Sequence, residues 1–194
     1  MAKKNARNTR GKIVNAAWKL FYEQGYEDTT VEEIIDLSGT SKGSFYHYFD
    51  GKDALLSTLS SLFDEKYEEL TQELTPEMTA MDQLLFLNQE LFRMIENSIS
   101  LDLLARLYST QLTTNGEKHL LDHNRIYYKL LKKIIAKGQA DDQLSTRSNV
   151  NEMVKLYALC ERALLYDWCL CSGEYSLVEY AAKVMPGFLS SFQP

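Results

Sequence analysis

Residues 29–56 decide the fold, and they read TTVEEIIDLSGTSKGSFYHYFDGKDALL. Thr30 stands three residues before Glu33, which is the spacing of a capping box, in which each side chain satisfies a free backbone N–H at the start of a helix. Apolar residues follow at helical spacing, and Gly39 ends the helix. The first part of this stretch therefore predicts a short amphipathic helix with a defined start and end.

A second short helix is expected directly after the turn. Thr40 or Ser41 can cap it, and it runs to about Tyr48 before Asp50 and Gly51 break it. Two short helices joined by a tight turn that contains a glycine have the outline of a helix-turn-helix. The stretch therefore predicts a motif that is typical of DNA-binding proteins.

Longer helices are expected on both sides of this pair. One amphipathic helix runs from about residue 9 to 22 and is ended by Gly25, and another runs from Lys52 to about Glu73. Further helical patterns cover about 77–97, 101–113, 117–138, 146–171 and 175–192, with weak breaks at 98–100, 115–116, 138 and 172–173, and Pro186 should bend or stop the last helix. The sequence predicts an all-α protein with a three-helix head, residues 1–51, and a helical body, residues 52–194.

The composition agrees with long helices. The chain of 194 residues has three prolines and nine glycines, fewer than the dense turns of a β-sandwich or barrel require. No apolar run approaches the about 18 residues of a membrane span, and the polar start lacks the apolar segment of a signal peptide. A soluble cytoplasmic protein with no membrane partner is therefore expected.

The charge is unevenly distributed along the chain. A net charge of −6 argues against indiscriminate nucleic-acid binding, because such proteins usually carry surplus Lys and Arg. Basic residues nevertheless gather ahead of the first acid, Glu23. They are Lys3, Lys4, Arg7, Arg10, Lys12 and Lys19. A basic arm on an acidic body predicts one face that meets phosphates.

The order SKGSFYHYFDGK, residues 41–52, resembles the DNA-binding signature of the TetR family of transcriptional regulators. With the helix before it, the resemblance covers roughly the first quarter of the chain. It implies an all-α homodimer whose two heads enter successive major grooves of double-stranded operator DNA. It also implies a C-terminal body that binds a small inducer and dimerises through its last two helices.

The resemblance places a set of residues at the DNA. Thr30 would contact a phosphate at the start of its helix. The other positions that touch DNA in family members are here Thr40, Ser41, Lys42, Gly43, Tyr46, His47, Tyr48 and Lys52. The chemistry agrees, because Ser41, Lys42 and Ser44 bring short polar or cationic groups to the positive end of a helix.

The aromatic residues of this stretch divide between core and surface. Phe45 and Phe49 stand four residues apart and share a helix face, so we expect them in the core of the head. Tyr46 and His47 fall off that face. A hydroxyl or an imidazole can hydrogen-bond a phosphate, so we expect both at the DNA surface.

The last two helices carry apolar stripes suited to a four-helix dimer interface. The stripes consist of Val150, Val154, Tyr157, Ala158, Glu161, Leu165 and Trp168 on one helix, and Tyr175, Val178, Ala181, Ala182 and Met185 on the other. Inducer pockets in the family lie among the middle helices. The candidates here are Phe86, Phe92, Met94, Leu104, Tyr108, Gln111, Tyr127, Tyr128, Arg162 and Trp168, although ordinary core packing is the common role of such residues.

Three features leave alternatives open. Arg162 lies in an apolar stretch and needs a partner, either a nearby carboxylate, which we favour, or an anionic ligand. His119 and His123 have the spacing of two metal ligands but no clear third, so a solvated polar face is favoured. Cys169 and Cys171 could sense oxidants, yet Cys160 and these two thiols are expected to be reduced and inert.

These patterns together predict a DNA-binding regulator, most simply a repressor that a small, largely apolar ligand releases from its operator. No cofactor is expected. An all-α enzyme that uses a cavity of the body is the alternative from another class, but the chain lacks the nucleophile elbow and the nucleotide-binding and zinc-binding motifs that position such chemistry. A helical adaptor with a protein-binding head and a regulator that senses redox state or metal are further alternatives.

Overall fold

Every element of the protein, in the part that its computed structural model describes, is helical. The described residues are 2–113 and 118–194, with side chains from residue 9 onward. The helices are α1 (Ala2–Glu23), α2 (Val31–Ser38), α3 (Lys42–Tyr48), α4 (Lys52–Leu56), α5 (Leu59–Thr71), α6 (Ala80–Ser98), α7 (Leu101–Thr113), η1 (His119–Leu121), α8 (Ile126–Ala140), α9 (Val150–Leu170), α10 (Leu177–Leu189) and η2 (Ser190–Phe192). The predicted fold class is confirmed, and none of these helices is long and apolar enough to cross a membrane.

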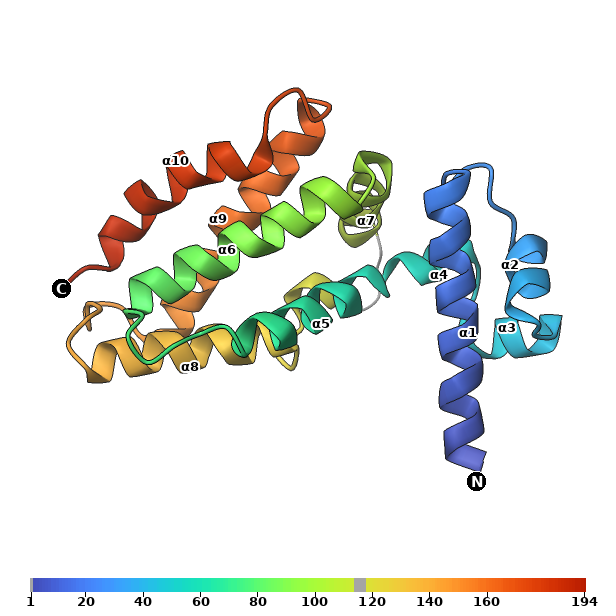
Figure 1. The fold of residues 1–194 in the computed structure, drawn as a ribbon, viewed down its shortest axis with the longest axis horizontal. Helices are drawn as coiled ribbons and strands as arrows, with labels where there is room; N and C mark the ends of the chain where they lie inside the picture. Colours follow the sequence, from blue (N-terminus) through green and yellow to red (C-terminus); the bar gives the residue numbers. More distant parts are fainter. Residues whose placement is uncertain (1, 114–117) are drawn as a thin grey trace.

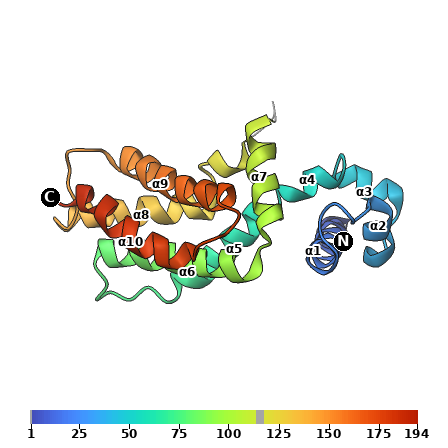
Figure 2. The same ribbon diagram turned by 90° about the horizontal axis from the view of Figure 1, so that it is seen from above.

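The molecule has a small head and a longer body. Helices α1, α2 and α3 form the head at one end, and α5, α6, α8, α9 and α10 form an elongated bundle at the other (Figure 1). Seen from above, α4 joins the two parts, and α7 stands at the end of the body that faces the head (Figure 2). The body therefore meets the head at α4 and α7.

The predicted helix from residue 52 to 73 is wrong as one element, because it breaks between α4 and α5. The Oγ of Ser57 donates to the carbonyl of Ala54 at 2.7 Å, and Oγ1 of Thr58 donates to that of Leu55 at 2.6 Å. Hydroxyls that bond to the preceding turn bend helices. The indole N–H of Trp18 in α1 also donates to Oγ1 of Thr58 at 2.9 Å. The break is thus held by a contact from the head, and it marks where the head meets the body.

Other predicted boundaries also need correction. Helix α8 begins at Ile126 rather than near residue 117, because the carboxylate of Asp122 accepts the N–H of Asn124 at 2.8 Å in a turn. Gly138 does not break α8 but lies inside it. Pro186 was expected to bend or stop the last helix, and it does not stop α10, which continues to Leu189. The expected break at 115–116 lies outside the described residues.

The stripes expected at a dimer interface lie in the core of the body instead. On α9, Val154, Tyr157 and Leu165 are buried, and on α10 Ala181 and Met185 are fully buried. They pack within one chain because α10 lies along α6 and α9 lies against α8. Most of the predicted interface residues are therefore core residues, whereas Ala182 is exposed and Val150, Tyr175 and Val178 are partly buried.

Candidate nucleic-acid interface and body cavity

The start of α2 has the predicted capping box. The hydroxyl of Thr30 accepts the N–H of Glu33 at 3.2 Å, and the backbone N–H of Thr30 donates to the Glu33 carboxylate at 2.7 Å. These hydrogen bonds lower the pKa of Glu33. Gly39 ends α2 in the left-handed conformation with φ of 61°, which glycine adopts without a steric penalty. Helix α3 then turns sharply away from α2.

Helix α3 presents a polar surface above an aromatic anchor. Its cap is Ser41, whose hydroxyl accepts the N–H of Ser44 at 3.1 Å. Phe45 and Phe49 are buried in the head, as predicted. The side chain of Tyr46 is exposed on the other side. The anchor therefore fixes how α3 presents its outer face.

The structure brings most of the sequence-predicted DNA residues to one exposed region. Ser41, Lys42, Gly43, Tyr46 and His47 are exposed at α3. Thr30 is exposed at the start of α2, while Thr40, Ser44 and Tyr48 are partly buried. The Oγ1 atom of Thr40 is hydrogen-bonded to the hydroxyl of Ser38.

Lys42 forms only a weak, exposed ion pair. Its ammonium lies 3.3 Å from a carboxylate oxygen of Glu32, and both side chains are about two-thirds exposed. Exposed pairs of this kind contribute about 0–1 kcal/mol. Lys42 can therefore exchange Glu32 for a phosphate at little cost.

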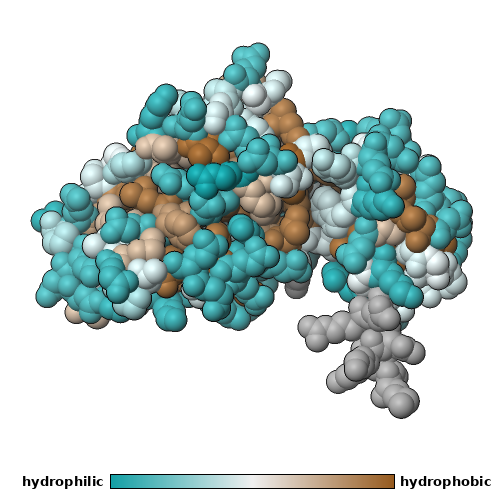
Figure 3. All heavy atoms as spheres, in the orientation of Figure 1, coloured by the Kyte–Doolittle hydropathy of each residue, from teal (hydrophilic) through white to brown (hydrophobic). Residues whose placement is uncertain are grey.

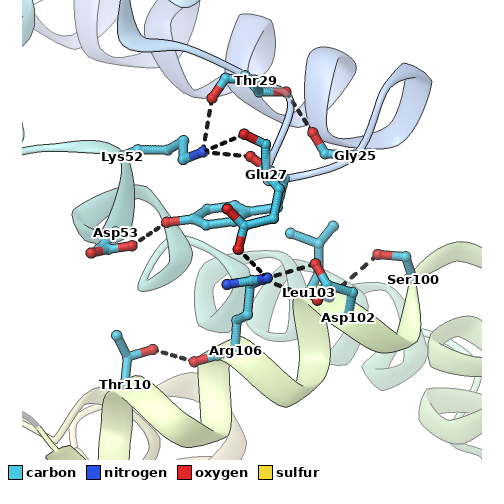
Figure 4. Close-up of polar contacts among 11 residues, drawn as sticks. Gly25, Glu27, Thr29, Lys52, Asp53, Ser100, Asp102, Leu103, Arg106 and Thr110 are labelled. Carbon is cyan, nitrogen blue, oxygen red and sulfur yellow. Dashed lines mark hydrogen bonds and ion pairs between the residues drawn. The ribbon is translucent and has the colours of Figure 1, made fainter. Parts of the chain in front are cut away.

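Lys52 differs from the other predicted DNA residues. Its ammonium donates to the carbonyl oxygens of Tyr26, Glu27 and Thr29 at 2.6, 3.2 and 2.8 Å. It also lies 4.3 Å from the ring centroid of Tyr26. All three N–H donors are used, so Lys52 fastens the loop between α1 and α2 to the start of α4 (Figure 4).

The basic arm is only partly within the described side chains. Lys3, Lys4 and Arg7 lie outside them. The guanidinium of Arg10 stacks over the Phe49 ring at 5.4 Å. Lys12 is exposed on α1.

A junction that the sequence did not reveal joins the head to α7. Arg106 of α7 forms ion pairs with Glu27 of the head and with Asp102 of its own helix. Its guanidinium also lies 4.9 Å from the ring centroid of Tyr26. The hydroxyl of Tyr26 in turn bonds to Asp53 of α4 (Figure 4). Burial and this carboxylate raise the pKa of Tyr26, so the hydroxyl remains a donor.

The body contains a small, partly open cavity of about 50 Å³ between α5, α6, α7, α8 and α9. It is lined by Phe63, Tyr67, Leu91, Ile95, Tyr108, Leu120, Arg125, Tyr127, Ala158, Glu161, Arg162 and Leu165. Three predicted ligand residues, Tyr108, Tyr127 and Arg162, are among them.

The remaining ligand candidates do not line this cavity. Phe92 and Leu104 are fully buried core residues. The Gln111 carboxamide accepts the N–H of Leu120, and the Tyr128 hydroxyl donates to the carbonyl oxygen of Leu120. The indole of Trp168 donates to the carbonyl of Tyr175 at 2.9 Å. Phe86 and Met94 pack partly buried against the core.

Glu161, one of the residues expected at a dimer interface, is a buried acid. Its carboxylate accepts the hydroxyl of Tyr127 at 2.6 Å and the amide of Asn88 at 2.9 Å. Burial raises the pKa of Glu161 although these hydrogen bonds and the neighbouring Arg162 oppose the rise. No periodicity rule identifies a buried carboxylate whose donors come from two other helices.

Arg162 is not paired with a carboxylate, so the interpretation favoured from the sequence is wrong. Among the described residues it forms no ion pair. Its Nη1 atom lies 3.3 Å from the hydroxyl of Tyr128.

The metal and redox alternatives gain no support. No group of three His, Cys, Asp or Glu residues in the described ranges could hold a metal ion. His123 instead packs its ring on Tyr128 at 4.6 Å between centroids. Burial raises the pKa of the Cys169 thiol to about 11, and that of Cys171 is also raised. Both shifts disfavour the reactive thiolate.

The fold and this site define a class of protein in which a helix-turn-helix head is attached to a helical body that contains a cavity. Residues 13–59 match the model for bacterial regulatory proteins of the tetR family. This match covers the second half of α1, all of α2, α3 and α4, and the first residue of α5.

Curated relatives match the head. The chain is 43% identical over 58 residues to an uncharacterized HTH-type transcriptional regulator in the lacX 3' region of Lactococcus lactis, and 36% identical over 61 residues to the HTH-type transcriptional regulator QacR of Staphylococcus aureus. These matches cover 29% and 31% of this chain. The chain spans 30% and 32% of the length of these relatives.

Solved structures match the whole chain in fold. FadR from Bacillus subtilis, in complex with stearoyl-CoA, has a TM-score of 0.71 at 20% identity and covers 95% of this chain and 100% of its own. FadR from Thermus thermophilus, a repressor in complex with lauroyl-CoA, has a TM-score of 0.71 at 21% identity and covers 94% of each chain. The body therefore shares the architecture of these regulators.

Proposed function

We propose that the protein is a transcriptional repressor that binds operator DNA in the cytoplasm through α3 and is released by a small molecule bound in the body cavity. The observation that carries this proposal is the exposed polar face of α3, which Phe45 and Phe49 hold in place. The N-terminal end of such a helix enters the major groove in helix-turn-helix proteins. The relatives that match the head are named as regulators, so the proposal assigns regulation rather than catalysis.

The proposed interface consists of Thr30, Thr40, Ser41, Lys42, Gly43, Ser44, Tyr46, His47 and Tyr48. Lys52 is left out because its donors are occupied within the head. We assign residues 1–51 to DNA binding and 52–194 to ligand binding and dimerisation. The boundary between these two parts lies at the start of α4.

DNA selection from a random duplex pool is the direct test. The protein should enrich a palindromic site, and Lys42→Ala should weaken binding by about 10- to 100-fold, since hydrogen bonds to charged groups contribute about 1.5–3 kcal/mol. The salt dependence of log K should also become shallower by about one unit. Lys137→Ala is the matched control, because Lys137 is also an exposed lysine in a surface ion pair. Equal affinities for the two variants would reject α3 as the interface.

A homodimer is the second part of the proposal, because two half-sites in adjacent major grooves need two heads. The supporting observation is an exposed apolar face on α9, where Leu159 is 53% and Leu170 is 64% exposed. Leu156 and Tyr166 lie at helical spacing on the same side, and Tyr180 is exposed on α10. Apolar areas also interrupt the hydrophilic surface of the body in Figure 3. Two such faces could form a four-helix interface.

Release by a ligand would act through the junction. Tyr108 of α7 lines the cavity, and Arg106 of the same helix is paired with Glu27 of the head. A ligand that moves α7 would change the position of the head relative to the body. Two heads spaced for adjacent grooves about 34–36 Å apart would then fit DNA less well.

A further inference from the structure

The charges around the body cavity are unevenly satisfied. Arg125 is paired with Asp64, with its Nη2 3.0 Å and its Nε 3.1 Å from the two carboxylate oxygens. Glu161 has both oxygens occupied by the donors of Asn88 and Tyr127. Arg162 has only the neutral hydroxyl of Tyr128 at 3.3 Å. The cavity wall therefore carries a cation whose charge no ion pair within the described residues balances.

A second polar group at the cavity is also incomplete. Tyr67 is buried, with 2% of its surface exposed, and its hydroxyl has no hydrogen-bond partner among the described residues. Its ring packs against Tyr127 at 5.0 Å between centroids, and the residue lines the cavity. Burying a hydroxyl without a partner costs free energy. A ligand with acceptor oxygens in the cavity would satisfy it.

The rest of the wall is apolar. Phe63, Leu91, Ile95 and Leu165 line the same cavity. Pockets that combine apolar walls with a few convergent polar groups orient amphipathic ligands.

We propose that the effector is a small amphipathic organic acid, bound as its anion with the acid group at Arg162 and Tyr67 and its hydrocarbon part against Phe63, Leu91 and Ile95. This proposal rests on the proposed ligand-released function and changes the expected ligand from largely apolar to apolar with one anionic group. A planar guanidinium forms two parallel hydrogen bonds with a carboxylate, which fixes the orientation of the ligand.

The same geometry disfavours a cationic ligand. Tyrosine rings and a buried acid could form a cage for a cation. The carboxylate of Glu161, however, is occupied by its donors, and burial raises its pKa, so its negative charge is disfavoured. Arg162 lines the cavity, and its charge would repel a positively charged ligand.

Binding requires the walls to separate. The cavity measures about 50 Å³, whereas sites for organic ligands are about 300–1,000 Å³. Tyr108 is the wall residue that belongs to α7, the helix joined to the head by Arg106. Expansion on the α7 side would link occupancy of the cavity to the junction.

The experiment compares three ligands of one chain length, octanoate, 1-octanol and octylammonium, by calorimetric titration of the full chain without DNA. Octanoate should bind most tightly and octylammonium least tightly. Arg162→Gln should weaken octanoate by about tenfold or more and leave 1-octanol nearly unchanged, because hydrogen bonds to charged groups contribute about 1.5–3 kcal/mol. Arg162→Lys should keep the preference for the anion. Arg93→Gln, at an exposed arginine of α6, should change nothing.

Several results would overturn the assignment. They are equal or tighter binding of octylammonium by the wild-type protein, no binding of any of the three ligands, or unchanged octanoate affinity in a folded Arg162→Gln variant. The comparison of ligands on the wild-type protein needs no variant to fold. A protein that binds octanoate but no DNA would keep this inference and reject the regulator. A protein that binds DNA but no anion would reject this inference alone.

Discussion

Gly138→Ala should lower the free energy of unfolding, whereas replacing a glycine inside a helix by alanine usually raises it. Alanine is favoured over glycine by about 1 kcal/mol inside a helix, and Gly138 lies within α8. A Cβ added there would lie 2.6 Å from the Cβ of Ala80 and 2.7 Å from Cδ1 of Leu144. Carbon atoms prefer about 3.5–4.0 Å. The new methyl group therefore requires a shift of about 1 Å between α8 and its neighbours.

The neighbours of Gly138 are poorly placed to yield. Ala80 begins α6, and its N–H donates to the carboxamide of Gln143 at 2.7 Å. The N–H groups of Gln143 and Leu144 both donate to the carbonyl of Gly138, at 2.8 and 3.0 Å. Overpacking of a core costs about 1–3 kcal/mol, which exceeds the gain in helix propensity. We expect a net loss of about 1–2 kcal/mol, or a fall in Tm of about 2–8 °C.

Thermal and urea unfolding would measure this loss against two matched glycines. Gly11 in α1 and Gly187 in α10 have no heavy atom within 4 Å of an added Cβ. Alanine at either position should stabilise the protein by about 0.5–1 kcal/mol. If Gly138→Ala stabilises the protein as much as these controls do, the close approach of α6 and α8 is incorrect.

Three further predictions concern the cavity, the dimer and the junction. Burial raises the pKa of Glu161. Between the ordinary pKa of a glutamic acid and this raised pKa, the folded state keeps a proton that the unfolded chain has lost. The free energy of unfolding should therefore fall as the pH rises through this range. Urea titrations across this range should show that Glu161→Gln removes that fall, by about 1.4 kcal/mol per unit of pKa rise. Leu159→Glu should yield folded monomers by sedimentation, whereas Ala181→Glu should unfold the chain because Ala181 is fully buried; a dimeric Leu159→Glu protein would rule out the α9 face. Lys52→Ala should lower Tm because it leaves three carbonyl oxygens without their donor. A Tm equal to that of the wild type would show that these hydrogen bonds do not stabilise the protein.

The head was predictable because its determinants are local. The capping box at Thr30 and Glu33 and the cap at Ser41 depend on residues three apart, so spacing alone defines them. Phe45 and Phe49 could be assigned to the core by their four-residue spacing. Features that a single turn of helix determines can be read from the sequence.

The body was less predictable because both faces of its last helices are apolar. On α9, Val154 and Leu165 form the core while Leu159 and Leu170 are exposed. Periodicity finds two stripes here and cannot say which one packs within the chain. The break after α4 was also missed, and there the hydroxyl of Thr58 accepts a hydrogen bond from Trp18, which is distant in sequence. Contacts between distant segments decide these features.

The position of α7 explains how one short helix can serve both the cavity and the head. Tyr108 and Arg106 are two residues apart, and successive residues on an α-helix are rotated by about 100°, so their side chains leave on nearly opposite sides. Tyr108 accordingly lines the cavity while Arg106 contacts Tyr26 and Glu27 of the head. A rigid helix with one face at each place cannot be displaced at the cavity without moving the guanidinium at the junction. Because Tyr26 is also bonded to Asp53 of α4, that movement would reach both connections between head and body together. We therefore expect the two connections to move together, with the ion pair of Arg106 and Glu27 as the link between the cavity and the head.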